Sequence, residues 1–132
     1  MSSRDTGTNT RRYPRLQCFV AVELCSEDPE LFVLGNLASI GLGGCGVEAN
    51  TLVEIGVRVE IASVENQARR VNGVVVNQRV LNDKPGFGIG VQFNDAAEQI
   101  NDFVKFVESK TQMDNQEHGY LTQLKRTEEE NL

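Results

Sequence analysis

The chain has 132 residues, a net charge of −6 at pH 7, and a composition of 39% hydrophobic and 24% charged residues. These values are typical of a single soluble globular domain with a modest core. The acidic balance argues against a nonspecific nucleic-acid binder. With no Trp and only two Tyr, the chain also lacks the aromatic residues of a platform that stacks single-stranded nucleic acid.

Neither a membrane span nor a secretory signal is expected. No apolar run approaches the roughly 18 residues of a membrane-spanning helix, and the opening residues, MSSRDTGTNTRR, contain no apolar stretch. The three cysteines, Cys18, Cys25 and Cys45, are an odd number without the close pairing of a zinc site, which fits a reducing compartment. We expect a cytoplasmic protein with no membrane insertion and no bound metal.

The first 93 residues have the pattern of a β protein. Residues 1–10 are small and polar, which predicts a flexible N-terminus. Six segments with alternating or β-branched apolar residues follow, separated by short turns. They are residues 16–24, 31–37, 46–49, 56–62, 69–81 and 86–93. Six strands joined by short turns predict a mainly β fold, either an antiparallel β-barrel or a sandwich.

The apolar period changes after residue 93. In residues 95–109, apolar side chains recur at spacings of three and four, which predicts an amphipathic helix. Asp95 and Glu98 have the spacing of a capping box at its start. We expect the apolar face of this helix to cover one end or one side of the strands; it carries Ile100, Phe103, Val104 and Val107.

The remaining residues, 110–132, are polar. A helix there could use Tyr120, Leu121 and Leu124 as its apolar side. Three consecutive acidic residues near the end, 128–130, would oppose the helix dipole at a C-terminus. We expect this tail to be disordered or weakly helical.

The stretch GLGGCG, Gly41 to Gly46, fits the G-x-G-x-x-G fingerprint of dinucleotide-binding folds. That fingerprint requires a helix directly after the glycines, because the helix N-terminus faces the pyrophosphate. Here the glycines are followed by further strand segments, and the first predicted helix begins about 50 residues later. We therefore interpret the glycines as a tight turn or a close approach between strands.

A cluster of arginines, RRYPR at residues 11–15, precedes the first predicted strand. Pro14 disfavours helical conformation at the residue before it, so the stretch should be extended. Arg11 and Arg15 then point to one side and Arg12 to the other. Two guanidinium groups on one side suit bidentate binding of a phosphate, or of the O6 and N7 acceptors of guanine.

Catalytic chemistry is not expected from this sequence. Catalysis needs an activated nucleophile or an acid–base pair. The one histidine, His118, lies in the polar tail, so the cysteines have no histidine partner. We therefore expect no catalytic residue and no enzymatic activity.

Three segments in order carry a resemblance to a known family. RRYPR resembles the R-x-x-x-R arm of PilZ domains, SIGLGGCGV is similar to their second motif, [D/N]-x-S-x-x-G, and GFGIGVQF is similar to their G-[IV]-x-F strand. The resemblance implies a PilZ-like domain over residues 11–109. Its parts are an arm at 11–15, a six-stranded antiparallel β-barrel at 16–93 and a C-terminal α-helix at 95–109.

The resemblance also implies a ligand, the bacterial second messenger cyclic di-GMP. In the family, the arm arginines grip the phosphates and guanines, and the second motif contacts a guanine from the barrel surface. By position, Arg11 and Arg15 are the two arginines of the arm, with Arg12 as a helper. The ligand is a bound nucleotide; no cofactor is implied.

The second motif departs from the family pattern. If Gly44 is the motif glycine, Ser39 stands at the acidic or amide position and Gly41 at the serine position. Ser39 cannot supply a carboxylate that accepts two guanine N–H groups, and a lost charged hydrogen bond costs roughly 1.5–3 kcal/mol. A shifted register would use Asn36 as the amide.

The function that the resemblance implies is a cyclic di-GMP receptor and adaptor. Its arm would become ordered on the nucleotide and change the surface shown to a protein partner. The alternative is a degenerate PilZ domain that acts through protein contacts without nucleotide. The partner itself is not identified by the sequence; motility, exopolysaccharide production and virulence control are all outputs of the family.

Overall fold

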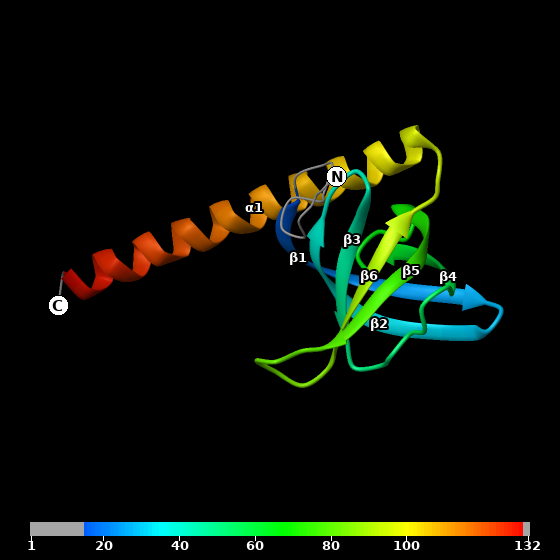
Figure 1. Cartoon of the computed structure of the whole chain (residues 1–132). Coiled ribbons are helices and arrows are strands. Elements are labelled where there is room, and N and C mark those ends of the chain that lie inside the picture. The colour runs from blue at the N-terminus through cyan, green and yellow to red at the C-terminus, as the bar shows by residue number, and fades with distance from the viewer. Residues whose placement is uncertain (1–14, 131–132) are drawn as a thin grey trace, which may run out of the picture.

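The six predicted strands form a closed antiparallel barrel (Figure 1). The computed structural model describes the backbone of residues 15–130 and the side chains of residues 15–113. The strands are β1 (Leu16–Glu27), β2 (Glu30–Ile40), β3 (Gly44–Ala49), β4 (Arg58–Ser63), β5 (Arg70–Val80) and β6 (Phe87–Phe93). The predicted fold class, a six-stranded barrel followed by a helix, is confirmed.

Strand order around the barrel is β1-β2-β3-β6-β5-β4, and β4 pairs with β1 to close it. Every pair is antiparallel. Closure removes the free strand edges that an open sheet would expose. A barrel therefore satisfies the backbone hydrogen bonds of six short strands without further layers.

The first two strands are longer than their apolar pattern predicts. Their pairing continues to Glu27↔Glu30, so only Asp28 and Pro29 remain in the turn. The outer ends of this hairpin are exposed, so backbone pairing holds them together although few of their side chains are buried. Apolar alternation marks the half of each strand that contacts the core, and it misses the rest.

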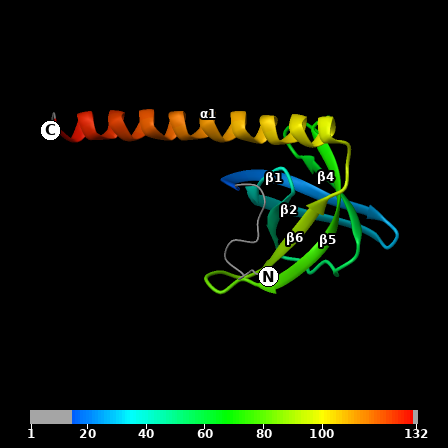
Figure 2. The same cartoon turned by 45° about the horizontal axis from the view of Figure 1, so that its top comes forward.

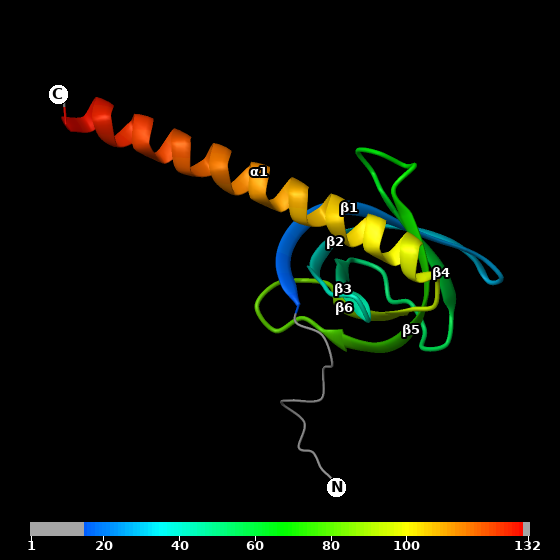
Figure 3. The same ribbon diagram turned by 90° about the horizontal axis from the view of Figure 1, so that it is seen from above.

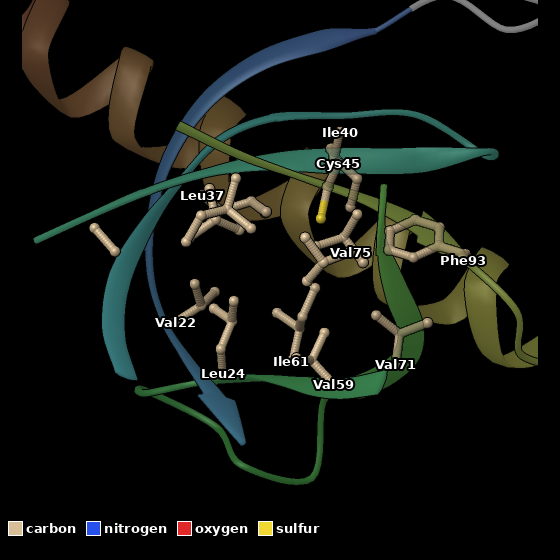
Figure 4. Packing of buried hydrophobic residues seen from close by; sticks show 14 of the residues in the cluster. Val22, Leu24, Leu37, Ile40, Cys45, Val59, Ile61, Val71, Val75 and Phe93 are labelled. Carbon is tan, nitrogen blue, oxygen red and sulfur yellow. The ribbon is translucent and has the colours of Figure 1, made fainter. Parts of the chain in front are cut away.

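The core fills the inside of the barrel (Figure 4). The alternation in β1 is confirmed at Val20, Val22 and Leu24, which are buried, and a bulge between Gln17 and Val20 leaves the start of the strand only half-buried. Figure 4 shows side chains from β1, β2, β3, β4, β5 and β6 converging on the barrel axis. Among those labelled are Val22, Leu24, Leu37, Cys45, Ile61, Val71 and Val75.

A helix, α1 (Ala97–Glu130), closes one end of the barrel (Figures 2 and 3). Its predicted apolar face is confirmed, because Phe103 and Val107 are buried in the same cluster as the strand side chains. The hydrogen bonds of Asp95 differ from those of the predicted capping box. One carboxylate oxygen accepts the Ala96 N–H and the other accepts the backbone N–H of Asn72 on β5, so Asp95 joins the helix start to the barrel.

The helix is also longer than expected. It was expected over residues 95–109, followed by a disordered or weakly helical tail at 110–132, but the backbone is helical to Glu130. The sequence after Pro85 contains no proline and is rich in Gln, Glu and Lys, which favour helix without burial. The second half of α1 extends away from the barrel (Figure 1). Within the described residues, no helix is both long and apolar enough to span a membrane.

Candidate functional site

The glycine-rich stretch forms the turn between β2 and β3 and the first half of β3. The Gly41 N–H donates to the Gly44 carbonyl at 2.9 Å, which closes the turn. At Gly44 a Cβ would overlap the Val91 carbonyl oxygen on the neighbouring strand β6. The stretch leads into a strand and not into a helix, so it is not a dinucleotide-binding fingerprint. Its glycines form a turn and allow β3 to approach β6 closely.

On the outer face of the barrel, glycines from two strands lie side by side. The register aligns Ser39, Gly46, Gly90 and Asn77 across β2, β3, β6 and β5. A second row, two residues along, aligns Glu48 and Gly88. Because the central positions have no side chains, the barrel surface is hollowed into a groove of about 310 Å³. Its lining includes Arg15, Gln17, Ser39, Glu48, Asn77 and Arg79.

One wall of the groove is formed by the start of β1 and the end of β2. The Arg15 guanidinium donates from Nη1 to the Ser39 hydroxyl at 3.2 Å. Gly46 lies directly beneath this pair, because a Cβ there would be 3.0 Å from Ser39 Oγ and 3.9 Å from Arg15 Nη1. The Arg15 guanidinium is therefore held over the glycine floor, with the neutral Ser39 hydroxyl as one of its partners.

The opposite wall is formed by β5. The Asn77 amide occupies the space that a side chain at Gly90 would take, since a Cβ there would lie 2.7 Å from Asn77 Cγ. The Arg79 side chain lies across Gly88, where a Cβ would be 3.3 Å from Nε and 3.5 Å from Cζ. A second guanidinium therefore borders the groove.

A carboxylate borders the groove at the second glycine row. Glu48, on β3, is paired with Lys84 in the loop between β5 and β6, at 2.7 Å between Oε1 and Nζ. The hydrogen bond to Glu48 raises the pKa of Lys84. The groove lining therefore carries two cations, Arg15 and Arg79, and one carboxylate, Glu48, whereas Lys84 lines the neighbouring cavity. The net positive charge of this lining favours an anion over a cation.

The residues predicted from sequence fall into three groups. Arg15 and Ser39 meet in the groove. Gly41 lies in the turn between β2 and β3, Gly44 begins β3, and neither residue lines the groove. Arg11 and Arg12 lie outside the described residues.

Asn36, the alternative amide position, lines a separate cavity of about 210 Å³ beside Glu48 and Lys84. Its Oδ1 is buried without a hydrogen-bond partner. The two cavities share Glu48, which stands at their boundary.

Sequence reasoning missed the other half of the groove, namely Glu48, Asn77 and Arg79. They are far from the arm in sequence, and only strand register brings them beside it. One signal was present: in GFGIGVQF the glycines at 88 and 90 alternate with the apolar residues Phe87, Ile89 and Val91, which predicts that they face outward. A bare outer face in a central strand indicates close approach by a ligand or another chain.

A larger cavity, about 620 Å³, lies elsewhere on the barrel and has a lining of different charge. Its charged lining residues are Glu27, Asp28, Glu60 and Arg58. The excess of carboxylates disfavours an anion there. The charge of the lining therefore favours the smaller groove as an anion site, although the other cavity is larger.

The cysteines have the environment of structural thiols. Burial raises the pKa of Cys18 to about 11 and that of Cys45 to about 12. Burial, followed by the charges of Glu23 and Glu60, also raises the pKa of Cys25. A nucleophilic cysteine requires a lowered pKa. Within the described residues, no cluster of His, Cys, Asp and Glu could hold a metal ion.

The sequence was compared with protein families. The PilZ domain model matches residues 9–109, which is most of the chain. The chain belongs to the PilZ domain family. The predicted resemblance, which rested on the arm, the second motif and the GFGIGVQF strand, is confirmed. A search of curated protein sequences gave no match.

Solved PilZ structures have the same fold. The PilZ domain of YcgR from Escherichia coli with c-di-GMP superposes with a TM-score of 0.62 at 14% identity, covering 84% of this chain and 98% of that one. The PilZ domain of CeSA from a cellulose-synthesizing bacterium gives 0.53 at 18% identity, covering 73% and 96%. The K. pneumonia MrkH–c-di-GMP complex gives 0.59 at 17% identity, covering 78% and 55%. This chain therefore spans about half the length of MrkH.

Proposed function

We propose that this PilZ chain is a cyclic di-GMP receptor that binds the nucleotide in the glycine-floored groove. The observation that carries the proposal is the pair of Arg15 and Ser39 above Gly46, on the wall of a groove with a local positive charge. A guanidinium suits both phosphate and the O6 and N7 acceptors of guanine. Two solved relatives, YcgR and MrkH, are complexes with c-di-GMP.

The second motif has a defined role in this proposal. Ser39 holds Arg15 through its hydroxyl, and Gly44 fixes the distance between β3 and β6 so that Gly46 and Gly90 stay level. The glycines leave room above β3 and β6 for the side chains of Ser39, Asn77 and Arg79, which would contact a base bound there. Gly41 contributes the turn that begins β3.

The proposed mechanism couples binding to ordering of the arm. Ligand phosphates are neutralised by Arg15 in the groove and by Arg11 and Arg12 on the preceding segment. Ordering that segment opposes binding by about 1–2 kcal/mol per fixed residue, so the arginine contacts must exceed this cost. The new surface then binds a protein partner. Because cyclic di-GMP is a bacterial second messenger, this function places the chain in the cytoplasm, as a receptor and not an enzyme.

Isothermal titration calorimetry with cyclic di-GMP tests the proposal. Wild type should give saturable heat at low micromolar concentration. Arg15→Ala should weaken binding by roughly ten- to hundredfold, since it removes a charged hydrogen bond worth about 1.5–3 kcal/mol. Arg58→Ala is the matched control, because that arginine lines the other cavity. Equal loss in both variants would indicate general charge attraction in place of a site.

A second function is an adaptor that binds protein without nucleotide. Two observations favour it: Ser39 has no carboxylate, and α1 extends past the barrel to Glu130. Under this alternative, wild type gives no heat with cyclic di-GMP up to about a millimolar concentration, and Arg15→Ala leaves partner binding unchanged. The same titration therefore separates the two functions.

A further inference from the structure

Glu48 is the one carboxylate among the described residues that line the groove. It lies on the outer face of β3, opposite Gly88 on β6, and two residues after Gly46 on the same strand face. It is therefore at the edge of the row of glycines that forms the groove floor. The other ionisable side chains of the lining, Arg15 and Arg79, only donate hydrogen bonds.

Only one of the two oxygens of the Glu48 carboxylate contacts Lys84. Lys84 binds Oε1 at 2.7 Å, and the Glu48 side chain is 25% exposed. Oε2 has no hydrogen-bond or ion-pair partner within the part of the chain that the structure describes. Lys84 thus contacts one oxygen of the carboxylate, and Glu48 itself lines the groove.

Guanine requires acceptors as well as donors. Its O6 and N7 accept hydrogen bonds, which arginines supply, whereas its N1–H and N2–H₂ groups donate and pair best with a carboxylate. Ser39 already accepts from Arg15 and has no carboxylate. A groove with Arg15 on one wall and a carboxylate at its floor can satisfy both edges of the base.

We propose that Glu48 is the carboxylate that recognises the donor edge of guanine in this chain, taking the role that Ser39 cannot fill. The inference rests on the proposed function and adds base specificity to it. Lys84 offsets the negative charge that would otherwise repel the ligand phosphates.

The test compares two ligands that differ at one group. Cyclic di-IMP has hypoxanthine in place of guanine and so lacks the N2 amino group. Calorimetry with both ligands gives a preference ratio for each protein. Wild type should prefer cyclic di-GMP by roughly tenfold or more, the value of one charge-assisted hydrogen bond.

Glu48→Gln should bind cyclic di-GMP roughly ten- to hundredfold more weakly, and its preference over cyclic di-IMP should fall to about threefold or less. Lys84→Met is the matched variant, because it breaks the same ion pair but keeps the carboxylate; it should retain the preference ratio. Thermal melts of both variants check that the fold is intact.

Three results would overturn the inference. If Glu48→Gln keeps the wild-type preference, another group recognises the base. If Lys84→Met loses the preference as fully as Glu48→Gln, the pair is structural. If wild type binds neither ligand, the proposed function itself fails, a result distinct from the first two.

Discussion

Two glycines of GLGGCG should have opposite roles, which a pair of identical substitutions can separate. At Gly44, an added Cβ overlaps the Val91 carbonyl oxygen, a backbone atom in the paired strand β6. At Gly46, the nearest atom is the Ser39 hydroxyl at 3.0 Å, which can rotate away. Gly44→Ala therefore forces strands apart, whereas Gly46→Ala needs only a side-chain adjustment.

The expected magnitudes follow from what must move. Overpacking a rigid core typically costs 1–3 kcal/mol, and a clash with backbone places Gly44→Ala near the top of that range, about 3 kcal/mol. For a domain of this size that is a fall in Tm of about 10 °C. Gly46→Ala should change the free energy of unfolding by less than about 1 kcal/mol, because relief of glycine flexibility offsets the close contact.

Urea denaturation followed by circular dichroism measures both effects. The same variants titrated with cyclic di-GMP should give the complementary result. The Gly46→Ala methyl group occupies the groove floor and should weaken binding by about fivefold or more, a steric cost of about 1 kcal/mol. A Gly44→Ala protein as stable as wild type would refute the reasoning, as would a Gly46→Ala protein that is strongly destabilised.

Three further predictions concern the barrel and its helix. Phe103→Ala, which empties a buried position between α1 and the barrel, should lower the free energy of unfolding by about 3–5 kcal/mol in urea titrations; a loss below 1 kcal/mol would mean that the helix does not close the core. Asp95→Ala removes the bonds to Asn72 and Ala96 and should cost about 1–2 kcal/mol by the same assay; no change would show that these bonds are not needed. Burial raises the pKa of Cys45 in the folded state from 9.0 to about 12, so the unfolded chain loses this proton first as pH rises. The contribution of Cys45 to the free energy of unfolding should be fully present below pH 9 and should be lost as pH rises toward 12. The free energy of unfolding of Cys45→Ala should therefore fall less steeply over this range, and equal slopes for the two proteins would contradict the prediction.

Much of the fold could be predicted from the sequence because its cause is local. The alternation of apolar residues in β1 and the spacing of three and four around Phe103 predict which side of each element is buried. The length of α1 could not be predicted by the same logic, since its second half extends past the barrel. Helix propensity without burial gives a weak pattern.

The site was predictable only in part, for a similar reason. Arg15 and Ser39 belong to motifs that can be recognised along the chain, and the structure brings them together. Glu48, Asn77 and Arg79 reach the groove through strand register, with a shift between Val75 and Asn77 that moves the end of β5. A bulge of this kind changes which residues face outward, and periodicity alone does not reveal it.

In the proposed complex, the outer-face groove holds the nucleotide. The most direct measurement is a ¹H–¹⁵N NMR titration with cyclic di-GMP, read at the glycine amides. Gly46, Gly88 and Gly90, which line the groove, should shift in a saturable manner. Gly73, which lines the larger cavity, and Gly56, which lines neither cavity, should not shift. Saturable shifts at Gly73 with none at Gly46 would contradict the account and place the ligand in the larger cavity.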